Sequence, residues 1–337
     1  MKIAFFSSKG YDREYFEKVN EDFGFELSFF ESRLNKYTVA LAKGHNAVCA
    51  FVNDKINENT LRAMDSEGIH VLALRCAGFN NVDLEAAEKY GITILRVPAY
   101  SPSAVAEHAL ALILTLNRKV HKAYNRVREG NFSLERLTGF NISGKTIGVV
   151  GTGAIGRAFI KLLSGFDVNI LAYDPYPNEM LQKQGVQYKS LDDLLSNSDI
   201  ISLHCPLTPD TYQIINKDTL AKVKPGAMLI NTSRGKLINT ENTIEALKNK
   251  QLGYLGIDVY AEEEKLFFKD LSEVIIDDDK IARLMSFPNV LVTSHQGFLT
   301  QEALEEIAKT TLKNLKDYRD GKKSDNEVNA AQFRNAG

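Results

Sequence analysis

The chain has 337 residues, and this length is more than one hydrophobic core usually organises. Because 44% of the residues are hydrophobic, there is enough apolar material for two compact units, so two domains are expected. Its 41 basic and 43 acidic residues nearly cancel to a net charge of -2, and neither sign forms a long block. This pattern argues against nucleic acid and against an anionic membrane as partners, and it leaves small molecules as the expected ones.

The chain is expected to be cytoplasmic. Its first residues, MKIAFFSSKGYD, are too poor in apolar residues for a secretory signal and are expected to form a strand. The longest apolar stretch, residues 109–116, is less than half of the roughly 20 residues that cross a membrane. Cys49, Cys76 and Cys205 form no CxxC pair and are odd in number, so we expect buried reduced thiols, with no disulfide framework and no metal site.

Short β-rich runs alternate with helical patterns along the whole chain. The runs are residues 2–7, 26–32, 47–52, 70–76 and 92–98, followed by 145–151, 168–174, 199–206, 227–233, 252–260 and 289–295. Near-continuous apolar strands separated by helices indicate parallel sheets covered by helices on both faces. The sequence therefore predicts an α/β protein with two doubly wound parallel sheets.

The boundary between the two units is expected where a long helix begins. Ser101 can cap this helix and Pro102 can occupy its first turn, and the pattern predicts one helix of roughly 40 Å that runs to about Gly130. Its first half is apolar on nearly all sides, so it is expected to be buried between domains or between subunits. We prefer a subunit interface, with a monomer as the alternative.

A second long helix is expected after His295, with Thr300 as its cap and Gly321 at its end. Because the strands of the second unit are complete by then, this helix is expected to return to the first unit. The predicted domains are residues 1–100 with 299–337, and residues 101–298. The last dozen residues are expected to be disordered.

A dinucleotide site is predicted in KTIGVVGTGAIGRAF. Gly151, Gly153 and Gly156 have the required spacing between a strand and a helix, and Asp174 ends the next strand. The glycines let the backbone approach a pyrophosphate, the amides of residues 154–156 face it, and Asp174 accepts from the ribose hydroxyls. A tight turn without a nucleotide is the alternative. DPYPNEM, which starts at Asp174, offers no Arg or Lys for a 2′-phosphate, so NAD is favoured over NADP.

A nicotinamide cofactor needs a protein group that moves a proton, and histidine suits this role. Of the six histidines, His204 and His295 follow predicted strands, at the edge where doubly wound sheets bind ligands. His204 is expected to shape the adenine side of the cofactor pocket. His295 can face the cleft between the units and is the preferred acid/base.

Two more strands end in charged groups at this edge. Arg234, in AMLINTSRGKL, could hold a carboxylate with two hydrogen bonds, although pairing with a surface acid is an equal alternative. The strand in GYLGIDVYAEEE ends in acids. An arginine, an acid and a histidine are therefore expected to converge.

Taken together, these motifs resemble the D-2-hydroxyacid dehydrogenase family, most closely its fermentative NAD-dependent D-lactate dehydrogenases. The resemblance runs through LALRCAGFNNVD, VPAYSPSAVAEHA, GTGAIG, HCPLTPDT, NTSRG, DVYAEEEKLFF and SHQGFLT. It implies a Rossmann cofactor domain inserted into a split flavodoxin-like substrate domain. Many relatives carry an acid where this chain has Ala261, a position without a catalytic role.

The resemblance also implies the role of individual residues. The catalytic arginine, acid and histidine fall on Arg234, Glu263 and His295. Cofactor contacts fall on Gly151, Gly153, Ala154, Ile155 and Gly156 at the pyrophosphate, Asp174 at the ribose, Cys205, Pro206 and Thr211 at the adenosine, and Thr232, Ser233 and Asp258 near the nicotinamide. Substrate contacts fall on the amides of Ala77 and Gly78, on Arg234, and on Tyr100 and Phe298.

The implied reaction is the reversible reduction of pyruvate to D-lactate by NADH. Glu263 is expected to orient His295 and favour its protonated form, whereas Glu262 and Glu264 are expected to be solvated. A dehydrogenase for a larger acid, such as hydroxyisocaproate or phenyllactate, is the alternative within the family. An NAD(H)-sensing scaffold that resembles the corepressors built on this fold is the alternative outside it. A homodimer, or a tetramer built from dimers, is expected.

Overall fold

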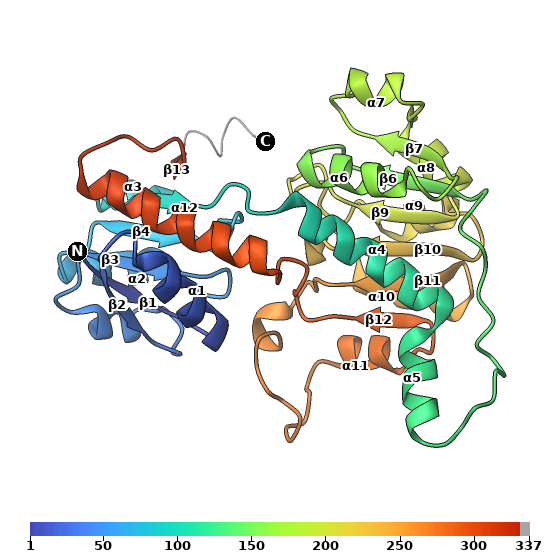
Figure 1. Ribbon diagram of the computed structural model, residues 1–337, viewed down its shortest axis with the longest axis horizontal. Helices are drawn as coiled ribbons and strands as arrows, with labels where there is room; N and C mark the ends of the chain where they lie inside the picture. Colours follow the sequence, from blue (N-terminus) through green and yellow to red (C-terminus); the bar gives the residue numbers. More distant parts are fainter. Residues whose placement is uncertain (331–337) are drawn as a thin grey trace. The chain divides into compact units, whose positions relative to one another are not determined.

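The computed structural model describes residues 1–330, and the chain divides into two compact units (Figure 1). The first unit consists of Met1–Ser101 and the segment that begins at Leu299, and the second consists of Pro102–Phe298. Each unit contains one sheet and the helices that cover it. The prediction of an α/β protein with two doubly wound sheets is confirmed.

The first unit is built on a six-stranded sheet with the order β13-β5-β4-β3-β1-β2. Its strands are β1 (Lys2–Phe5), β2 (Glu26–Phe29), β3 (Ala47–Ala50), β4 (Val71–Leu74), β5 (Thr93–Arg96) and β13 (Glu327–Val328). The first five pair in parallel, and every residue of β3 and β4 is buried, which explains their continuous apolar sequence.

The short strand β13 corrects one prediction. It pairs antiparallel to β5, with Glu327 opposite Leu95 and Val328 opposite Ile94, so the start of the last dozen residues is ordered. These backbone hydrogen bonds come from a distant strand, and local composition does not reveal them. The rest of that predicted segment, residues 331–337, lies outside the described residues.

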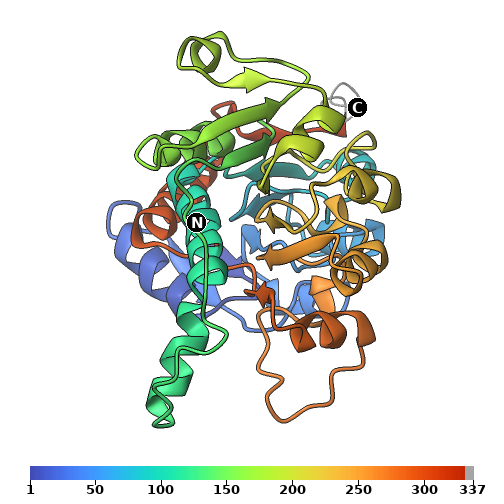
Figure 2. The ribbon, with the colours of Figure 1, turned by 90° about the vertical axis from the view of Figure 1, so that its right-hand side faces the viewer.

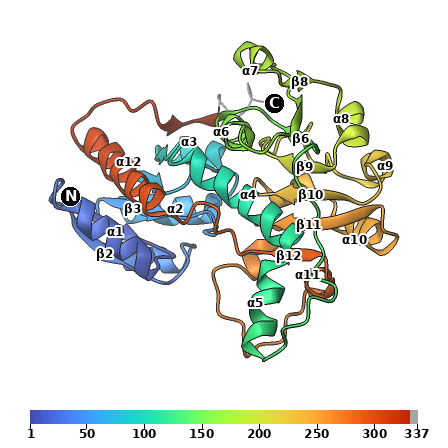
Figure 3. The same ribbon diagram turned by 45° about the vertical axis from the view of Figure 1, so that its right-hand side comes forward.

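Helices cover both faces of the first sheet. They are α1 (Gly10–Asn20), η1 (Thr38–Ala42), α2 (Glu58–Ser66), α3 (Leu84–Lys89) and α12 (Gln301–Arg319). The helix α12, which Thr300 caps as predicted, packs beside α1 and over β4 and β5 (Figures 1 and 3). Because β1-α1-β2 advances along the sheet in the opposite direction from β3-α2-β4 and β4-α3-β5, right-handed crossovers place α1 on one face and α2 and α3 on the other.

The second unit is built on a seven-stranded parallel sheet with the order β12-β11-β10-β9-β6-β7-β8. Its strands are β6 (Thr146–Val150), β7 (Asn169–Tyr173), β8 (Gln187–Tyr188), β9 (Ile200–Leu203), β10 (Ala227–Asn231), β11 (Leu252–Ile257) and β12 (Val290–Val292). The strand β8, only two residues long, was not predicted. The order reverses between β6 and β9, and such a reversal marks where ligands bind open α/β sheets.

Two layers of helices enclose this sheet. They are α4 (Pro102–Arg118), α5 (Val120–Arg128), α6 (Ala154–Leu163), α7 (Glu179–Lys183), α8 (Leu191–Asn197), α9 (Lys217–Lys222), α10 (Thr240–Lys248) and α11 (Asp279–Ser286), with short 3-10 turns η2 (Gly235–Leu237) and η3 (Glu263–Lys265). Alternate residues of β10 enter two cores, Met228 and Ile230 with α4 and α6, and Leu229 with α8 to α11. Figure 2 shows α4 on one side of the strands and the yellow and orange helices on the other.

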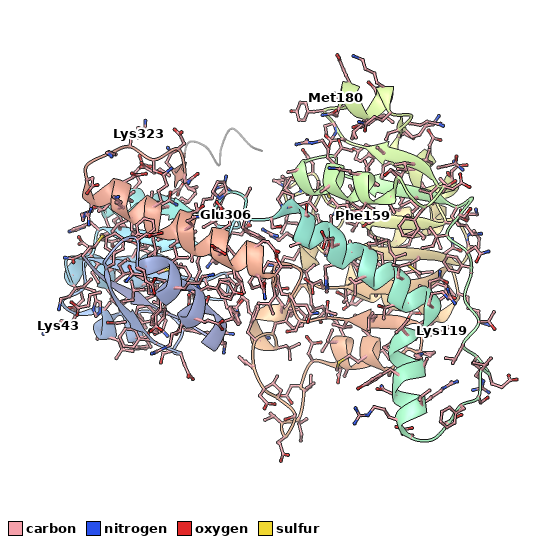
Figure 4. All side chains as sticks on the ribbon, in the orientation of Figure 1. Lys43, Lys119, Phe159, Met180, Glu306 and Lys323 are labelled. Carbon is pink, nitrogen blue, oxygen red and sulfur yellow. The ribbon has the colours of Figure 1, made fainter. Side chains whose placement is uncertain are left out.

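The predicted single helix of residues 101–130 is wrong, because it breaks at Lys119 (Figure 4). Lys119 has φ +52°, which no α-helix accommodates, and its Nζ donates to the carbonyls of Arg136 and Thr138 at 2.8 and 3.0 Å. The buried Asn117 exchanges two hydrogen bonds of 2.8 Å with the Phe140 backbone. Contacts with residues 136–140 therefore end α4 and start α5 in a new direction.

The three cysteines lie in the cores of the two units or at their edges. Cys49, Cys76 and Cys205 are buried thiols, as predicted, and burial raises the pKa of Cys49 and of Cys205 to about 12. Among the helices of residues 1–330, none has the length and apolar composition needed to cross a membrane.

Candidate active site

The candidate residues of the second unit lie at one edge of its sheet. Gly151 follows β6, Asp174 follows β7, Cys205 follows β9, Arg234 follows β10, Asp258 follows β11 and His295 follows β12. Because all seven strands are parallel, these loops share the carboxyl edge of the sheet. Arg234, Asp258 and His295 belong to three neighbouring strands.

The glycine-rich loop has a shape that only glycine permits. Gly151 has φ +95°, and a Cβ there would lie 2.6 Å from the Cys205 amide nitrogen, while a Cβ on Gly156 would lie 2.0 Å from the Gly151 carbonyl oxygen. Gly153 is the cap residue of α6, and a Cβ there would meet nothing within 4 Å. The first turn of α6, with Ala154 and Ile155, therefore faces open space without a side-chain cap, which fits a pyrophosphate.

The side chain of Asp174 is fixed beside this loop. Its Oδ2 accepts from the Thr152 amide at 2.6 Å and the Thr152 hydroxyl at 3.0 Å, and its Oδ1 accepts from the Tyr176 amide at 2.9 Å. Asp174 is partly exposed, and a carboxylate can accept about four hydrogen bonds. It keeps capacity to accept from ribose hydroxyls.

The loops after β9 and β10 are joined to each other. The Ser233 hydroxyl donates to the Cys205 carbonyl at 2.6 Å, and the Thr211 hydroxyl donates to the Pro206 carbonyl at 2.6 Å. Thr232 is buried, and its hydroxyl has no hydrogen-bond partner among residues 1–330. Because an unsatisfied buried hydroxyl costs about 1–3 kcal/mol, a bound polar group would be stabilised here. These loops therefore fit a cofactor.

His204 serves the core of the second unit. It is buried, its Nε2 lies 2.9 Å from the Ser202 hydroxyl, and its ring centre lies 4.9 Å from that of Phe159. Burial lowers the pKa of His204 to about 3, so the ring stays neutral. A permanently neutral histidine is a poor proton donor near pH 7, which favours His295 as the acid/base.

His295 pairs with the middle one of three consecutive glutamates. Its Nδ1 lies 3.0 Å from Glu263 Oε1, and the two side chains are 18% and 17% exposed. The other carboxylate oxygen, Oε2, accepts from the Tyr260 amide at 3.0 Å, which holds the carboxylate in place. Glu262 and Glu264 are exposed. With Nδ1 engaged, Nε2 is the nitrogen of His295 that remains for chemistry.

The backbone of His295 has an uncommon conformation that Asp258 supports. His295 has φ +50°, and its amide donates to the Asp258 carbonyl at 2.7 Å. The buried Asp258 carboxylate accepts from the amides of Gln296 and Gly297 at 2.9 and 2.8 Å. This aspartate therefore fixes the turn that carries His295.

A histidine of α4 reaches the same aspartate. His108 Nε2 lies 3.2 Å from Asp258 Oδ1, and the Thr293 hydroxyl donates to that oxygen as well. Burial alone would raise the pKa of Asp258, but the hydrogen bonds from His108, Thr293 and Gln296 outweigh it and lower the pKa to about 2. Sequence analysis assigned His108 no catalytic or binding role, because nothing local shows that α4 passes this strand end.

Two aromatic rings flank His295. The ring centre of Phe298 lies 6.5 Å and that of Phe268 lies 5.9 Å from the imidazole centre. Phe298 was predicted as a pocket residue, whereas Phe268 was missed. Phe268 has φ +63°, a rare conformation for an aromatic residue, and no local signal distinguishes it from its neighbour Phe267. Both rings lie beside the imidazole, whose side chain is 18% exposed.

Arg234 has no acidic partner within residues 1–330, so the alternative of a surface ion pair is not found. Its Nη1 donates to the Ser233 carbonyl at 2.8 Å, and Asn231 holds the turn by donating to the Arg234 carbonyl at 2.9 Å. The partly buried guanidinium keeps donors for an anionic ligand.

The remaining predicted residues belong to the first unit. Ala77 and Gly78 follow β4, and Tyr100 follows β5, at the carboxyl ends of neighbouring parallel strands. Ala77, Gly78 and Tyr100 are partly exposed. This edge is the place where a doubly wound sheet binds ligands.

Comparisons with known proteins agree with this geometry. Residues 110–297 match the family model for the NAD binding domain of D-isomer specific 2-hydroxyacid dehydrogenases. The D-lactate dehydrogenase of Escherichia coli (strain K12) is 52% identical over 328 residues, which cover 97% of this chain and 100% of that protein. A 2-hydroxyacid dehydrogenase homologue of Haemophilus influenzae is 52% identical, with coverage of 97% and 99%. The apo-structure of the Escherichia coli D-lactate dehydrogenase superposes with a TM-score of 0.90 at 50% identity, with coverage of 97% and 100%.

Proposed function

Because the chain belongs to the D-isomer-specific 2-hydroxyacid dehydrogenase family, we propose that it is an NAD-dependent D-lactate dehydrogenase that reduces pyruvate reversibly to D-lactate. The observation that carries this proposal is the pair of His295 Nδ1 and Glu263 Oε1, which lie 3.0 Å apart. His295 follows β12 and Arg234 follows β10, and these two strands are separated in the sheet only by β11. This arrangement provides a proton donor and a carboxylate-binding cation at one sheet edge.

The cofactor site is assigned to the loops at the carboxyl edge of the second unit. NADH, when bound, supplies the hydride. Gly151, Gly153, Gly156 and the amides of Ala154 and Ile155 would hold the pyrophosphate, Asp174 the ribose, Cys205, Pro206 and Thr211 the adenosine, and Thr232 and Ser233 the nicotinamide side. Both oxygens of Asp258 already accept from protein donors, so we assign it the support of the His295 turn beside the nicotinamide.

His295 is assigned the proton transfer. In the direction of reduction, its protonated Nε2 donates a proton to the oxygen bonded to C2 of pyruvate, where negative charge develops. In the direction of oxidation, the neutral ring accepts this proton from the hydroxyl of lactate. Glu263 on Nδ1 orients the ring and stabilises its positive charge. Phe268 and Phe298 keep water away, which strengthens the electrostatic interactions at the ring.

Substrate orientation is assigned to Arg234 together with backbone amides. Two parallel hydrogen bonds from the guanidinium fix the plane of the pyruvate carboxylate, which a lysine cannot do. The amides of Ala77 and Gly78 are assigned to the same carboxylate, and Tyr100 and Phe298 to the wall of the pocket. Fixing the carboxylate determines which face of C2 accepts the hydride, and therefore the D configuration of the product.

A substrate panel tests this function. With NADH, the protein is expected to reduce pyruvate with a higher kcat/KM than phenylpyruvate or 2-oxoisocaproate, and a stereospecific assay should identify the product as D-lactate. A higher kcat/KM for the bulky acids would assign the chain to a larger D-2-hydroxy acid. NADH binding without turnover of any of them would assign it to an NAD(H)-sensing role.

We also propose that the protein forms homodimers, or tetramers built from dimers. The helix α5 has no buried residue, and Val120, Tyr124 and Val127 lie exposed at helical spacing on one face. Phe132 and Leu134, exposed by 75% and 80%, follow it. An apolar surface of this kind is typical of a protein interface. Sedimentation of the Tyr124→Asp protein, which should dissociate, checks this proposal.

We also propose a cytoplasmic location. Cys49, Cys76 and Cys205 are free thiols, and reduced cysteines are typical of cytoplasmic proteins.

A further inference from the structure

In the loop after β4 in the first unit, RCAGF, three backbone carbonyls are hydrogen-bonded and two backbone amides are not. This inference rests on the proposed function, which assigns the amides of Ala77 and Gly78 to the substrate carboxylate. Ala77 and Gly78 are partly exposed, and within residues 1–330 neither amide donates a hydrogen bond. The two preceding carbonyl groups, in contrast, are both held by neighbouring groups of the protein.

Those two carbonyls face the end of β5. The Cys76 carbonyl accepts from the Val97 amide at 3.2 Å, and the Ala77 carbonyl accepts from Arg96 Nη1 at 2.9 Å. In a trans peptide the C=O of one residue and the N–H of the next are coplanar and point in opposite directions. The Val97 amide on the Cys76 carbonyl therefore turns the Ala77 N–H away from the end of β5, and the Arg96 guanidinium on the Ala77 carbonyl turns the Gly78 N–H away from itself.

The next carbonyl of the loop is held as well. Cys76 Sγ lies 3.2 Å from the Gly78 carbonyl oxygen. Three consecutive peptide planes thus have their carbonyls bound from within the first unit. The Ala77 and Gly78 amides are left as two adjacent donors without a partner among residues 1–330, and successive backbone N–H groups of this kind can form a concave anion site without any charged side chain.

Arg96 itself is held in place. Its guanidinium lies 5.1 Å from the ring centre of Phe79, its amide donates to the Asn326 carbonyl at 3.0 Å, and its carbonyl accepts from Asn314 Nδ2 at 2.9 Å. Asn326 and Asn314 are joined by a hydrogen bond of 2.9 Å. The returning segment of the chain therefore fixes the residue that holds the loop.

We propose that Arg96 is a positioning residue for substrate binding, which acts by holding the Ala77 carbonyl so that the Gly78 amide, beside that of Ala77, faces the pyruvate carboxylate. Arg96 forms no ion pair within residues 1–330, so its charge also favours an anion in this region. Substitutions of Arg96 can separate the effect of its hydrogen bond to the Ala77 carbonyl from the effect of its positive charge.

Three variants test this role. Arg96→Met removes the hydrogen bond and the charge, Arg96→Lys keeps the charge without the planar fork, and Arg62→Met removes an exposed arginine of the same unit as a control. For each protein, KM and kcat with pyruvate, the Kd of NADH, the Tm, and the Kd of oxamate in the presence of NADH are measured. Oxamate carries the carboxylate of pyruvate but accepts no hydride.

We expect Arg96→Met to raise the KM of pyruvate and the Kd of oxamate about tenfold, which is about 1.4 kcal/mol, while kcat changes less than about threefold and NADH binding is kept. Arg96→Lys should recover less than half of this loss on a logarithmic scale. Arg62→Met should match the wild type.

Three results would overturn the inference. Unchanged KM and oxamate affinity in Arg96→Met would remove the role, and wild-type values in Arg96→Lys would show that charge alone acts. An equal loss of NADH affinity together with a lower Tm would make Arg96 a purely structural residue. The wild type is measured first, because its failure to reduce pyruvate would refute the proposed function itself, independently of Arg96.

Discussion

The two sheets of this protein end in similar edges but use their charged residues differently. At the edge of the second unit, Arg234 and the pair of Glu263 and His295 are partly exposed and have capacity for a ligand. At the edge of the first unit, Arg75 and Asp12 are buried against each other at 3.0 Å. The charge of Arg75 is therefore used within the first unit, whereas the charged side chains at the edge of the second unit remain partly accessible to a ligand.

The buried charges of the first unit form a structural network. Arg75 Nη2 donates to the Ser7 carbonyl at 2.9 Å, and the Asp54 carboxylate accepts from the Ser7 hydroxyl at 2.6 Å and the Leu34 amide at 2.7 Å. Burial raises the pKa of Asp54, against the opposing effect of these hydrogen bonds. Here a charged residue at a strand end stabilises the fold, so residue type alone does not identify a catalytic group.

The largest expected effect breaks the chemistry of the second unit. His295→Ala should lower kcat for pyruvate reduction about 1,000-fold, because the developing negative charge on oxygen then has no proton donor. NADH binding, measured by fluorescence, should stay within about twofold of the wild type because the pyrophosphate loop is untouched. Turnover at the wild-type rate would refute the assignment of His295.

The next effect breaks the first unit instead. Arg75→Met should lower the free energy of unfolding by about 3 kcal/mol, because it leaves the Asp12 carboxylate buried without its cation. Urea unfolding followed by circular dichroism measures this change. Arg62→Met, on the exposed face of α2, should stay within about 0.5 kcal/mol of the wild type. Equal stabilities for the two variants would contradict the proposed network.

A smaller effect separates three adjacent acids of the second unit. Glu263→Gln should lower kcat/KM for pyruvate about tenfold near neutral pH, since the protonated His295 loses its anionic partner at 3.0 Å. Glu262→Gln and Glu264→Gln remove the same charge from exposed positions and should change kcat/KM less than about twofold. Similar losses in all three proteins would indicate a general effect of charge.

The smallest effect concerns His204, a buried ionisable group of the second unit. Like the buried charges of the first unit, it contributes to the stability of the fold. Its pKa is lowered by burial from 6.5 to about 3, so as the pH falls below about 6.5 the unfolded state takes up a proton and the folded state does not. The stability that the neutral ring contributes is complete above pH 6.5 and is lost towards pH 3.

Between pH 7 and pH 5.5 this difference should cost the wild type about 1 kcal/mol of unfolding free energy. The His204→Asn protein does not titrate at this position, and its stability should fall correspondingly less over the same interval. Urea unfolding at the two pH values measures both proteins. Equal falls in both would show that His204 does not contribute.

The sequence was most informative where a residue type and a strand end coincide. Within residues 1–330, apolar runs revealed every strand longer than two residues, and β8 and β13 were missed. The helix break at Lys119 was missed because the sequence around it favours a helix, and the contacts that end α4 come from residues 136–140. Phe268 and His108 were missed for the same reason, since each reaches the His295 turn only through the folded chain.

The backbone groups of the first edge also have a consequence for mutation. Every amino acid except proline supplies the same N–H, so a substitution of the Ala77 side chain leaves its amide donor intact. The anion contact that we propose for this amide would therefore tolerate changes of the side chain at residue 77. In a random mutant library, the substitutions that weaken this contact should instead be concentrated at residue 96, whose side chain donates a hydrogen bond to the Ala77 carbonyl. Selection would then act on an arginine whose proposed role is to hold the loop and not to contact the substrate.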